Sequence, residues 1–195
     1  MNKVVIIGGM AAGCKAGARL KRINPNYNVT IIEKRAFVSY GACGMPMFAS
    51  GDVDDFYDLA KTPFGVIRDE EYFEKVKDIR TLTNTQAVSI NTQEKYVEIK
   101  NLQTGDAGNI KYDYLIISTG AKAAKAPFPC PESENISTFH NPLDAKRFRE
   151  KAQTGKVGSA VIIGGGYIGC ELAEALVSLW GIDTTLIEKE NRLLP

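Results

Sequence analysis

The N-terminal stretch VVIIGGMAAGCKAGARL, residues 4–20, sets the architecture of this chain. Four apolar residues run into a pair of glycines, and a segment rich in alanine follows. Apolar runs that end in glycine suit parallel strands that are buried on both faces. The stretch therefore predicts a strand, a glycine turn and a helix, which together open a βαβ unit.

The same pattern occurs a second time in AVIIGGGYIGCELAEAL, residues 160–176. Farther along each copy, TIIEK (residues 30–34) corresponds to TLIEK (residues 185–189). Each copy thus contains a strand, a glycine turn, a helix, a second strand and an acidic residue. The repeat predicts two βαβ units. The positions that coincide are Gly8 and Gly164, Gly9 and Gly165, Gly13 and Gly169, Cys14 and Cys170, and Leu20 and Leu176.

Each βαβ unit has the features of a dinucleotide-binding site. The first glycine allows the tight turn, the second lets the backbone approach a pyrophosphate, and the third permits close packing of helix and strand. The helix N-terminus offers free N–H groups to the phosphates. Glu33 and Glu188 end the second strands, where a carboxylate can accept hydrogen bonds from ribose hydroxyls. The second turn has all three glycines, whereas Met10 replaces the middle one in the first turn.

Residues 80–114, between the two repeats, contain short β-prone runs separated by polar turns. They predict an antiparallel meander that returns to a parallel strand, YLIIS, which ends at Ser118 and precedes a proline-rich connector. We expect helices near residues 54–60, 68–77 and 142–153. The predicted fold is α/β: a Rossmann-like domain with an antiparallel β-meander, followed by the start of a second Rossmann-like domain.

Composition limits the partners that the chain can have. Its 24 basic and 23 acidic residues give a net charge of +1, so there is no basic surface suited to nucleic acid or an anionic membrane. No apolar run approaches the length of a membrane span, and the N-terminus lacks the features of a signal peptide. We therefore expect a cytoplasmic protein with neither nucleic acid nor a membrane as a partner.

The four cysteines lie far apart, and none is part of a CxxC pair. This spacing favours neither a metal site nor a disulfide framework, so no metal is expected. In a reducing cytosol, Cys14, Cys130 and Cys170 are expected to be buried thiols. Cys43 lies among small residues and a proline in SYGACGMP, residues 39–46. It could be a small apolar side chain, half of a disulfide, a metal ligand or a reactive thiol.

Motifs along essentially the whole chain resemble those of the pyridine nucleotide–disulfide oxidoreductases: in order, GGMAAG, Glu33, the cysteine loop, YDYLIISTGA and GGGYIGCELAEAL. The loop SYGACGMP, followed by LAKTP, is similar to that of the single-cysteine branch. This branch comprises coenzyme A disulfide reductases, NADH-dependent persulfide or sulfur reductases, and NADH oxidases and peroxidases. The resemblance implies an FAD-binding domain at residues 1–125, which includes the redox-cysteine loop. It implies a connector and an incomplete NAD(P)-binding domain at residues 126–195, the N-terminal portion of a longer enzyme.

The resemblance also implies a redox role for Cys43. Two-cysteine relatives have a second thiol five positions later, where this chain has Phe48. Electrons are therefore expected to pass from NAD(P)H through FAD to Cys43, and then to a small disulfide, persulfide or polysulfide, with coenzyme A as one candidate thiol. The alternatives are an NADH oxidase or peroxidase that works through a cysteine sulfenic acid, and a noncatalytic nucleotide-binding fragment.

Departures from the relatives bear on the substrate. Peroxidase-type relatives carry a histidine where this chain has Ala11, and its one histidine, His140, lies in a polar connector. Disulfide or persulfide reduction is therefore favoured over peroxide reduction. Coenzyme A disulfide reductases often have asparagine and tyrosine where this chain has Ala42 and Met47, which leaves coenzyme A itself unassigned. NADH is expected to be preferred, with NADPH as an alternative, because Glu188 would repel a 2′-phosphate.

The resemblance implies candidate residues for both sites. Tyr167 resembles an aromatic gate over the flavin and Glu171 a carboxylate that orients the nicotinamide; a packed tyrosine and an exposed glutamate are the alternatives. A homodimer is expected, formed by a C-terminal domain outside these residues. The FAD site would comprise Gly8, Met10, Ala11, Ala12, Gly13, Glu33, Lys34, Ser39, Thr119 and Gly120. The nicotinamide site would comprise Gly164, Gly165, Gly166, Tyr167, Ile168, Gly169 and Glu188.

Overall fold

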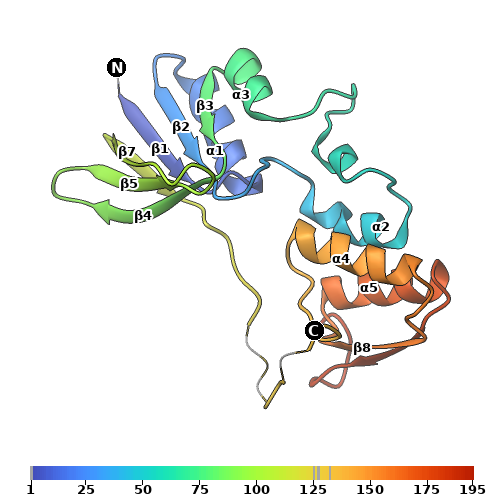
Figure 1. The fold of residues 1–195 in the computed structure, drawn as a ribbon. Helices are drawn as coiled ribbons and strands as arrows, with labels where there is room; N and C mark the ends of the chain where they lie inside the picture. Colours follow the sequence, from blue (N-terminus) through green and yellow to red (C-terminus); the bar gives the residue numbers. More distant parts are fainter. Residues whose placement is uncertain (1, 125, 127, 132) are drawn as a thin grey trace. The chain divides into compact units, whose positions relative to one another are not determined.

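The computed structural model describes residues 2–124, 126, 128–131 and 133–195. The chain forms two compact units, each built from two segments (Figure 1). The first unit consists of Met1–Tyr40 and Ala60–Ala121, and the second unit consists of Gly41–Leu59 and Lys122–Pro195.

A parallel sheet of four strands forms the centre of the first unit, in the order β3-β2-β1-β7 (Figure 1). Val5 of β1 pairs with Thr30 of β2 on one side and with Leu115 of β7 on the other. The predicted βαβ unit and the predicted return of YLIIS as a parallel strand are both confirmed. The elements are β1 (Lys3–Ile7), α1 (Ala11–Ile23), β2 (Asn28–Ile32), β3 (Ile79–Leu82) and β7 (Tyr114–Ile117).

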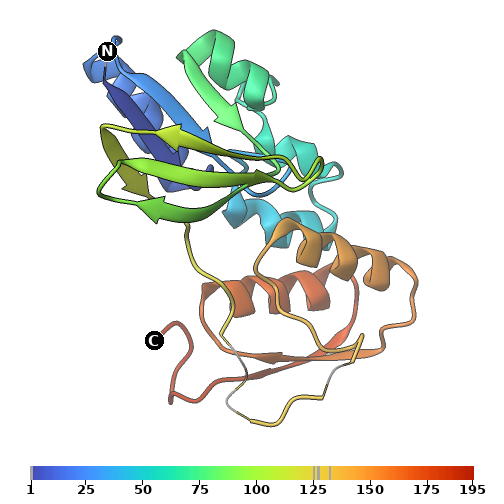
Figure 2. The ribbon, with the colours of Figure 1, turned by 60° about the vertical axis from the view of Figure 1, so that its left-hand side comes forward.

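Both faces of this sheet are covered. On one face, α1 and α3 (Glu70–Lys77) pack Cys14 and Phe73 against the strands. The antiparallel meander lies over the other face (Figure 2). Its Val97 packs against Val5 and Ile32. This double cover explains why β1 and β2 are buried along almost their whole length, as their continuous apolar runs predict. The meander has the order β4-β5-β6 and consists of β4 (Thr85–Asn91), β5 (Tyr96–Asn101) and β6 (Ala107–Lys111).

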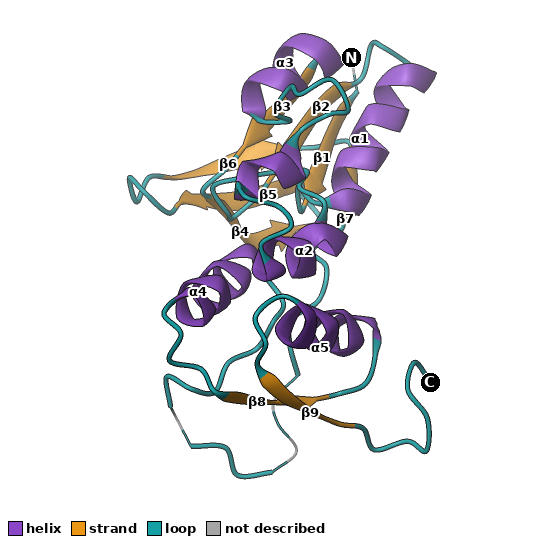
Figure 3. Cartoon of the chain, turned by 90° about the vertical axis from the view of Figure 1, so that its right-hand side faces the viewer, coloured by secondary structure: helices purple, strands orange, loops and turns teal. Residues whose placement is uncertain are grey.

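The second unit packs helices against a parallel pair of strands (Figure 3). Its core includes Ala49 of α2 together with Leu172 and Leu176 of α5. Figure 3 shows α2 beside α4 and α5, in agreement with the contacts between these helices. The elements are η1 (Ala42–Gly44), α2 (Met45–Ser50), α4 (Pro142–Gln153), β8 (Ser159–Ile163), α5 (Tyr167–Ser178) and β9 (Asp183–Ile187).

The helices agree with the sequence-based expectations. α4 spans the predicted residues 142–153. α3 begins at Glu70 because Asp69 caps it, accepting a hydrogen bond of 2.9 Å from the Tyr72 N–H. Near residues 54–60 the chain forms a 3₁₀ helix, η2 (Phe56–Ala60). No described helix is both long enough and apolar enough to cross a membrane.

The compact units differ from the predicted domains at residues 41–59 and at the boundary, which lies after Ala121 instead of after residue 125. The sequence places all of residues 1–125 in one domain, whereas the structure groups Gly41–Leu59 with the C-terminal part of the chain. The reason is packing, since Ala49 of α2 is fully buried in the same core as Leu172 and Leu176. Cys43 therefore belongs to the second unit.

We expect the β8–β9 sheet to be the least protected sheet of the chain. Its outer face is exposed: Val161 and Ile163 are each 63% exposed, whereas Val5 and Ile6 in β1 are fully buried. Strands with few buried contacts open locally at low free-energy cost. Amides of β8 should exchange with deuterium about a hundredfold faster than those of β1. Hydrogen exchange measured by mass spectrometry tests this, and equal protection of the two strands would contradict it.

Candidate functional site

The first glycine turn joins β1 to α1. Gly8 has a φ of +109°, a conformation that favours glycine, and its N–H donates to the Ile32 carbonyl oxygen at 2.8 Å. A Cβ on Gly13 would overlap the Gly8 carbonyl oxygen and lie 2.7 Å from Ser118 Oγ. Both glycines are therefore required by the backbone geometry. Met10, at the N-cap of α1, gives no side-chain cap, so the N–H groups of the first helical turn are open to a ligand.

The second turn repeats this geometry between β8 and α5. Gly164 has a φ of +112°, and its N–H donates to the Ile187 carbonyl oxygen at 2.8 Å. A Cβ on Gly169 would overlap the Gly164 carbonyl oxygen. Gly166 is different, because it has no positive φ and a Cβ there would meet nothing within 4 Å. Neither strain nor packing requires glycine at 166, which fits a position where a ligand approaches the backbone.

The two acidic residues each accept a hydrogen bond from a backbone N–H of the glycine turn in their own repeat. Glu33, 3% exposed, accepts a hydrogen bond from the Gly9 N–H at 2.8 Å, and Glu188 accepts one from the Gly165 N–H at 2.6 Å. Backbone N–H groups of Glu190 and Gly165 lower the pKa of the Glu188 carboxyl from its usual value. Glu188 is therefore ionised at neutral pH. The two copies of the sequence repeat therefore form the same hydrogen bonds between the acidic residue and the glycine turn.

Other predicted residues of the first site lie around the same turn. The Ser39 N–H donates to the Gly9 carbonyl oxygen at 2.9 Å, while Lys34 is exposed. Thr119 and Gly120 are exposed and directly follow Ser118. Ser118 itself was not predicted, yet its Oγ lies 3.0 Å from the carbonyl oxygens of Ile7 and Gly8. Its place at the end of a strand that pairs with β1 was the signal that could have identified it.

The cysteines at the repeat positions contact the turns. Sγ of Cys14 lies 3.0 Å from the Gly9 carbonyl oxygen, and Sγ of Cys170 lies 3.4 Å from that of Gly165. Burial raises the pKa of the Cys14 thiol to about 12, so this cysteine is unreactive at neutral pH. A packing role is confirmed for Cys14, while Cys170 is half-buried.

Residues 2–195 match the family described as pyridine nucleotide-disulphide oxidoreductase. The chain belongs to this family.

Relatives of this chain include reductases named for disulfide, polysulfide and persulfide. A coenzyme A disulfide reductase of Staphylococcus haemolyticus is 31% identical over 198 residues, which cover 100% of this chain and 42% of that protein. An NAD(P)H coenzyme A polysulfide/persulfide reductase of Pyrococcus horikoshii is 34% identical over 193 residues, 99% of this chain and 41% of that protein. The solved structure of an NAD-dependent persulfide reductase from A. fulgidus has a TM-score of 0.92 and 39% identity, over 99% of this chain and 35% of that one.

These comparisons confirm the predicted family and fold class. The chain spans about two fifths of the length of the curated relatives it matches.

Cys43 is an exposed thiol on η1. The Gly44 N–H closes the turn by donating to the Gly41 carbonyl oxygen at 2.9 Å. Phe48, five residues after Cys43, is buried and offers no thiol. Cys130 is also exposed, so the expectation that it is buried was wrong. Pro129 and Pro131 on either side of it are exposed as well, so no buried neighbour in the chain draws it into a core.

The remaining predicted residues lie at the start of α5. Tyr167 is the first residue of this helix and is 75% exposed, so it is not the packed tyrosine of the alternative interpretation. Ile168 and Glu171 are exposed on the same helix. Among the described residues, no group of three or more His, Cys, Asp or Glu side chains could hold a metal ion.

Proposed function

We propose that this oxidoreductase binds FAD at the first glycine turn and a nicotinamide nucleotide at the second. Electrons pass from NAD(P)H to Cys43 and then to a small disulfide, persulfide or polysulfide. The observation that carries the proposal is the pair of matching glycine turns in a chain whose cysteine loop presents the exposed thiol of Cys43 and has Phe48 where a second thiol would stand. Relatives named for coenzyme A disulfide and for polysulfide or persulfide support this class of substrate.

The residues of both turns fit a dinucleotide. In the first turn, the open N–H groups at the start of α1 would hold the pyrophosphate of FAD, and Glu33 the adenosine ribose. In the second turn, Gly166 would leave room for the pyrophosphate of the nicotinamide nucleotide, and Glu188 would hold its adenosine ribose. FAD, when bound, supplies two-electron transfer between nicotinamide and sulfur. Tyr167 and Glu171 are proposed to cover and orient the nicotinamide.

The covalent step takes place at the sulfur of Cys43. The Cys43 thiolate attacks one sulfur of the substrate disulfide, so a mixed disulfide forms and one substrate thiolate leaves. Two electrons and one proton, supplied by NADH, then cleave the mixed disulfide. This regenerates the Cys43 thiolate and releases the second substrate half as a thiol. Because residue 48 is phenylalanine, a disulfide within the cysteine loop cannot compete with this reaction sequence.

Spectroscopy and steady-state assays of the full-length protein, loaded with FAD, test the proposal. NADH should bleach the flavin absorbance, and turnover with coenzyme A disulfide or polysulfide should exceed turnover with oxygen or hydrogen peroxide. Faster turnover with oxygen or peroxide would identify an oxidase or peroxidase instead. Failure to take up flavin would identify a noncatalytic protein.

We expect NADH to be preferred to NADPH because the ionised Glu188 carboxylate would repel a 2′-phosphate. Glu188→Gln keeps an oxygen that can accept from the Gly165 N–H but removes the charge. It should lower the ratio of kcat/KM for NADH to that for NADPH by at least about tenfold. Glu190→Gln is the control, since Glu190 is exposed and its carboxylate contacts only Lys189 among the described interactions. An unchanged ratio in Glu188→Gln would contradict the assignment.

Gly166→Ala should separate nucleotide binding from folding. The added methyl group meets no protein atom within 4 Å, so the free energy of unfolding should change by less than about 1 kcal/mol. The methyl would instead occupy the space of the pyrophosphate, and the Kd for NADH should rise at least about tenfold. Gly158→Ala is the control, because a Cβ at that position also meets no protein atom within 4 Å and the position lies outside the glycine turn. Equal NADH binding by the two variants would argue against a nucleotide at this turn.

We also propose a cytoplasmic location, because all four cysteines are free thiols. The homodimer expected from the resemblance stays a prediction.

A further inference from the structure

Helix α2, which directly follows the turn that carries Cys43, is too short to hold its own position. It has six residues, Met45–Ser50, and isolated helices shorter than about 12 residues are marginal in water. Five of its residues are buried, so its geometry is set by what packs against it. The contacts at its C-terminal end therefore contribute to the position of α2 and of the turn that precedes it.

Arg149 of α4 binds the end of α2 and the turn after it. Its Nη1 lies 2.6 Å from the Val53 carbonyl oxygen and 3.3 Å from that of Phe48. It also lies 3.0 Å from the Asp54 carbonyl oxygen, and the guanidinium carbon is 4.8 Å from the centre of the Phe48 ring. The Arg149 side chain is only 14% exposed. A planar guanidinium suits this combination of ring stacking and several carbonyl acceptors, which an ammonium group does not reproduce.

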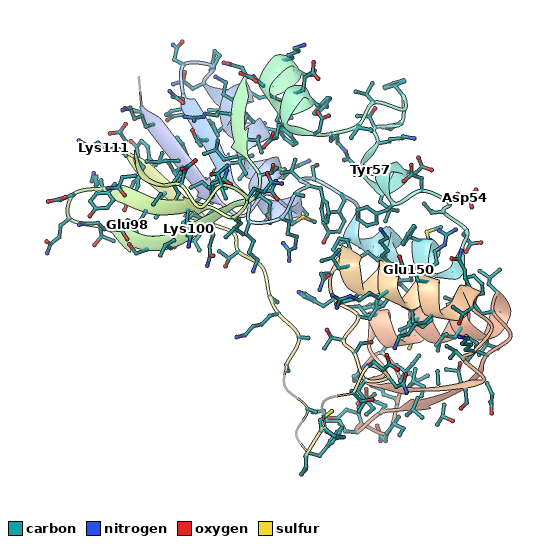
Figure 4. All side chains as sticks on the ribbon, viewed as in Figure 1. Asp54, Tyr57, Glu98, Lys100, Lys111 and Glu150 are labelled. Carbon is teal, nitrogen blue, oxygen red and sulfur yellow. The ribbon has the colours of Figure 1, made fainter. Side chains whose placement is uncertain are left out.

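The acidic neighbour of Arg149 contributes little. The Asp54 carboxylate, labelled in Figure 4, lies 3.7 Å from Nη2 of Arg149 but is 97% exposed. Exposed ion pairs of this kind contribute little to stability, because solvent screens the two charges. The contacts that matter are those from the guanidinium to backbone carbonyls and to the Phe48 ring.

Trp180 makes a second contact with α2. Its Nε1–H donates to the Ala49 carbonyl oxygen at 2.9 Å, and Ala49 is fully buried. A buried carbonyl oxygen that loses its donor is left unsatisfied and without water, which is unfavourable. Trp180 lies just after the end of α5, the helix that begins at the second glycine turn. Helix α5, together with Trp180 after its end, thus connects the second glycine turn to α2, the helix next to Cys43.

We propose that Arg149 and Trp180 are positioning residues for Cys43, which hold α2 so that the thiol is presented in one orientation for reaction. The proposal rests on the redox role of Cys43 proposed above. Arg149 and Trp180 are assigned from their contacts in the structure. They lie 101 and 131 residues along the chain from the α2 carbonyls that they bind, so no local sequence pattern identifies them.

The test combines a spectroscopic probe with kinetics in the full-length protein loaded with FAD. A nitroxide is attached to Cys43 in a Cys130→Ser background, because Cys130 is the other exposed thiol. Arg149→Met and Trp180→Phe should narrow the nitroxide spectrum, since the backbone that carries the label becomes more mobile. In the unlabelled proteins, kcat for disulfide reduction should fall about tenfold. KM for NADH and the rate at which NADH bleaches the flavin should change less than about twofold. The kcat of Arg149→Lys should lie between that of Arg149→Met and that of the parent protein, because an ammonium group replaces only part of the guanidinium contacts.

Two matched controls accompany these variants. Arg147→Met removes an exposed arginine from the same helix, which also carries the exposed Glu150 labelled in Figure 4. Asp54→Asn removes the exposed carboxylate but keeps the backbone carbonyl. Both variants should keep the nitroxide spectrum and the kcat of the parent protein.

Nitroxide spectra of Arg149→Met and Trp180→Phe that match Arg147→Met would overturn the proposal. So would a fall in kcat that occurs only together with loss of bound flavin. The nitroxide result does not depend on the redox role of Cys43, which is tested separately by its replacement.

Discussion

Cys43→Ser should lower the reduction of disulfide and persulfide substrates by at least about a thousandfold, while NADH still bleaches the bound flavin. Serine cannot form a mixed disulfide, so the covalent intermediate is lost. Binding of both nucleotides is expected to survive, because Cys43 lies in neither glycine turn. Direct reaction of the reduced flavin with oxygen should also survive. Cys43 is exposed, so the substitution removes no core contact.

Cys130→Ser is the matched control for this experiment. Cys130 is exposed too, but it lies in the proline-rich connector, so the same substitution should leave turnover unchanged. Stopped-flow absorbance measures the flavin step, and steady-state assays with coenzyme A disulfide and polysulfide measure turnover. If Cys43→Ser keeps near-normal turnover, the sulfur step proposed for this residue is wrong.

Gly13→Ala should destabilise the first unit by about 4 kcal/mol or more. The added Cβ would overlap the Gly8 carbonyl oxygen, which is backbone and cannot rotate away as a side chain can. The turn would have to open, and the N–H groups proposed to bind the phosphates would move with it. We therefore expect both a lower midpoint of urea denaturation and the loss of bound FAD.

Gly17→Ala, on the same helix, is the control for this change. A Cβ there would meet methyl groups of Ile6, Ile79 and Ile31 at 3.3 to 3.5 Å, a distance that small side-chain shifts can relieve. The helix propensity of alanine exceeds that of glycine by about 1 kcal/mol. The net change should stay within about 1 kcal/mol. Equal denaturation midpoints for Gly13→Ala and Gly17→Ala would show that close helix–strand packing is not what glycine 13 provides.

Local features of the sequence were enough to predict most of the fold. Apolar runs that end at Gly8 and Gly164 predicted the buried strands, and the structure places positive φ angles at both glycines. The short runs between residues 80 and 114 predicted the meander. These signals act between residues close in the chain, through strand periodicity and turn stereochemistry, so they can be recognised without knowledge of packing.

The site was predicted where it repeats a local motif. Glu33 and Glu188 were assigned from their place after the second strands, and each carboxylate does reach its own glycine turn. Ser118 was missed, because its contact with Gly8 exists only once β7 lies beside β1, about 110 residues away in the chain. A side chain that acts across a sheet has no short-range signature.

Tertiary packing alone assigned the Cys43 segment to the second unit. The motif marks Cys43 as exceptional, but it contains nothing that favours α4 and α5 as the partners of α2. Those partners are chosen by a small buried residue, Ala49, and by hydrogen-bond donors on Arg149 and Trp180 that satisfy backbone carbonyls. Such contacts depend on shape and on hydrogen-bond satisfaction between distant parts of the chain, whereas strands and glycine turns depend on the local order of residues.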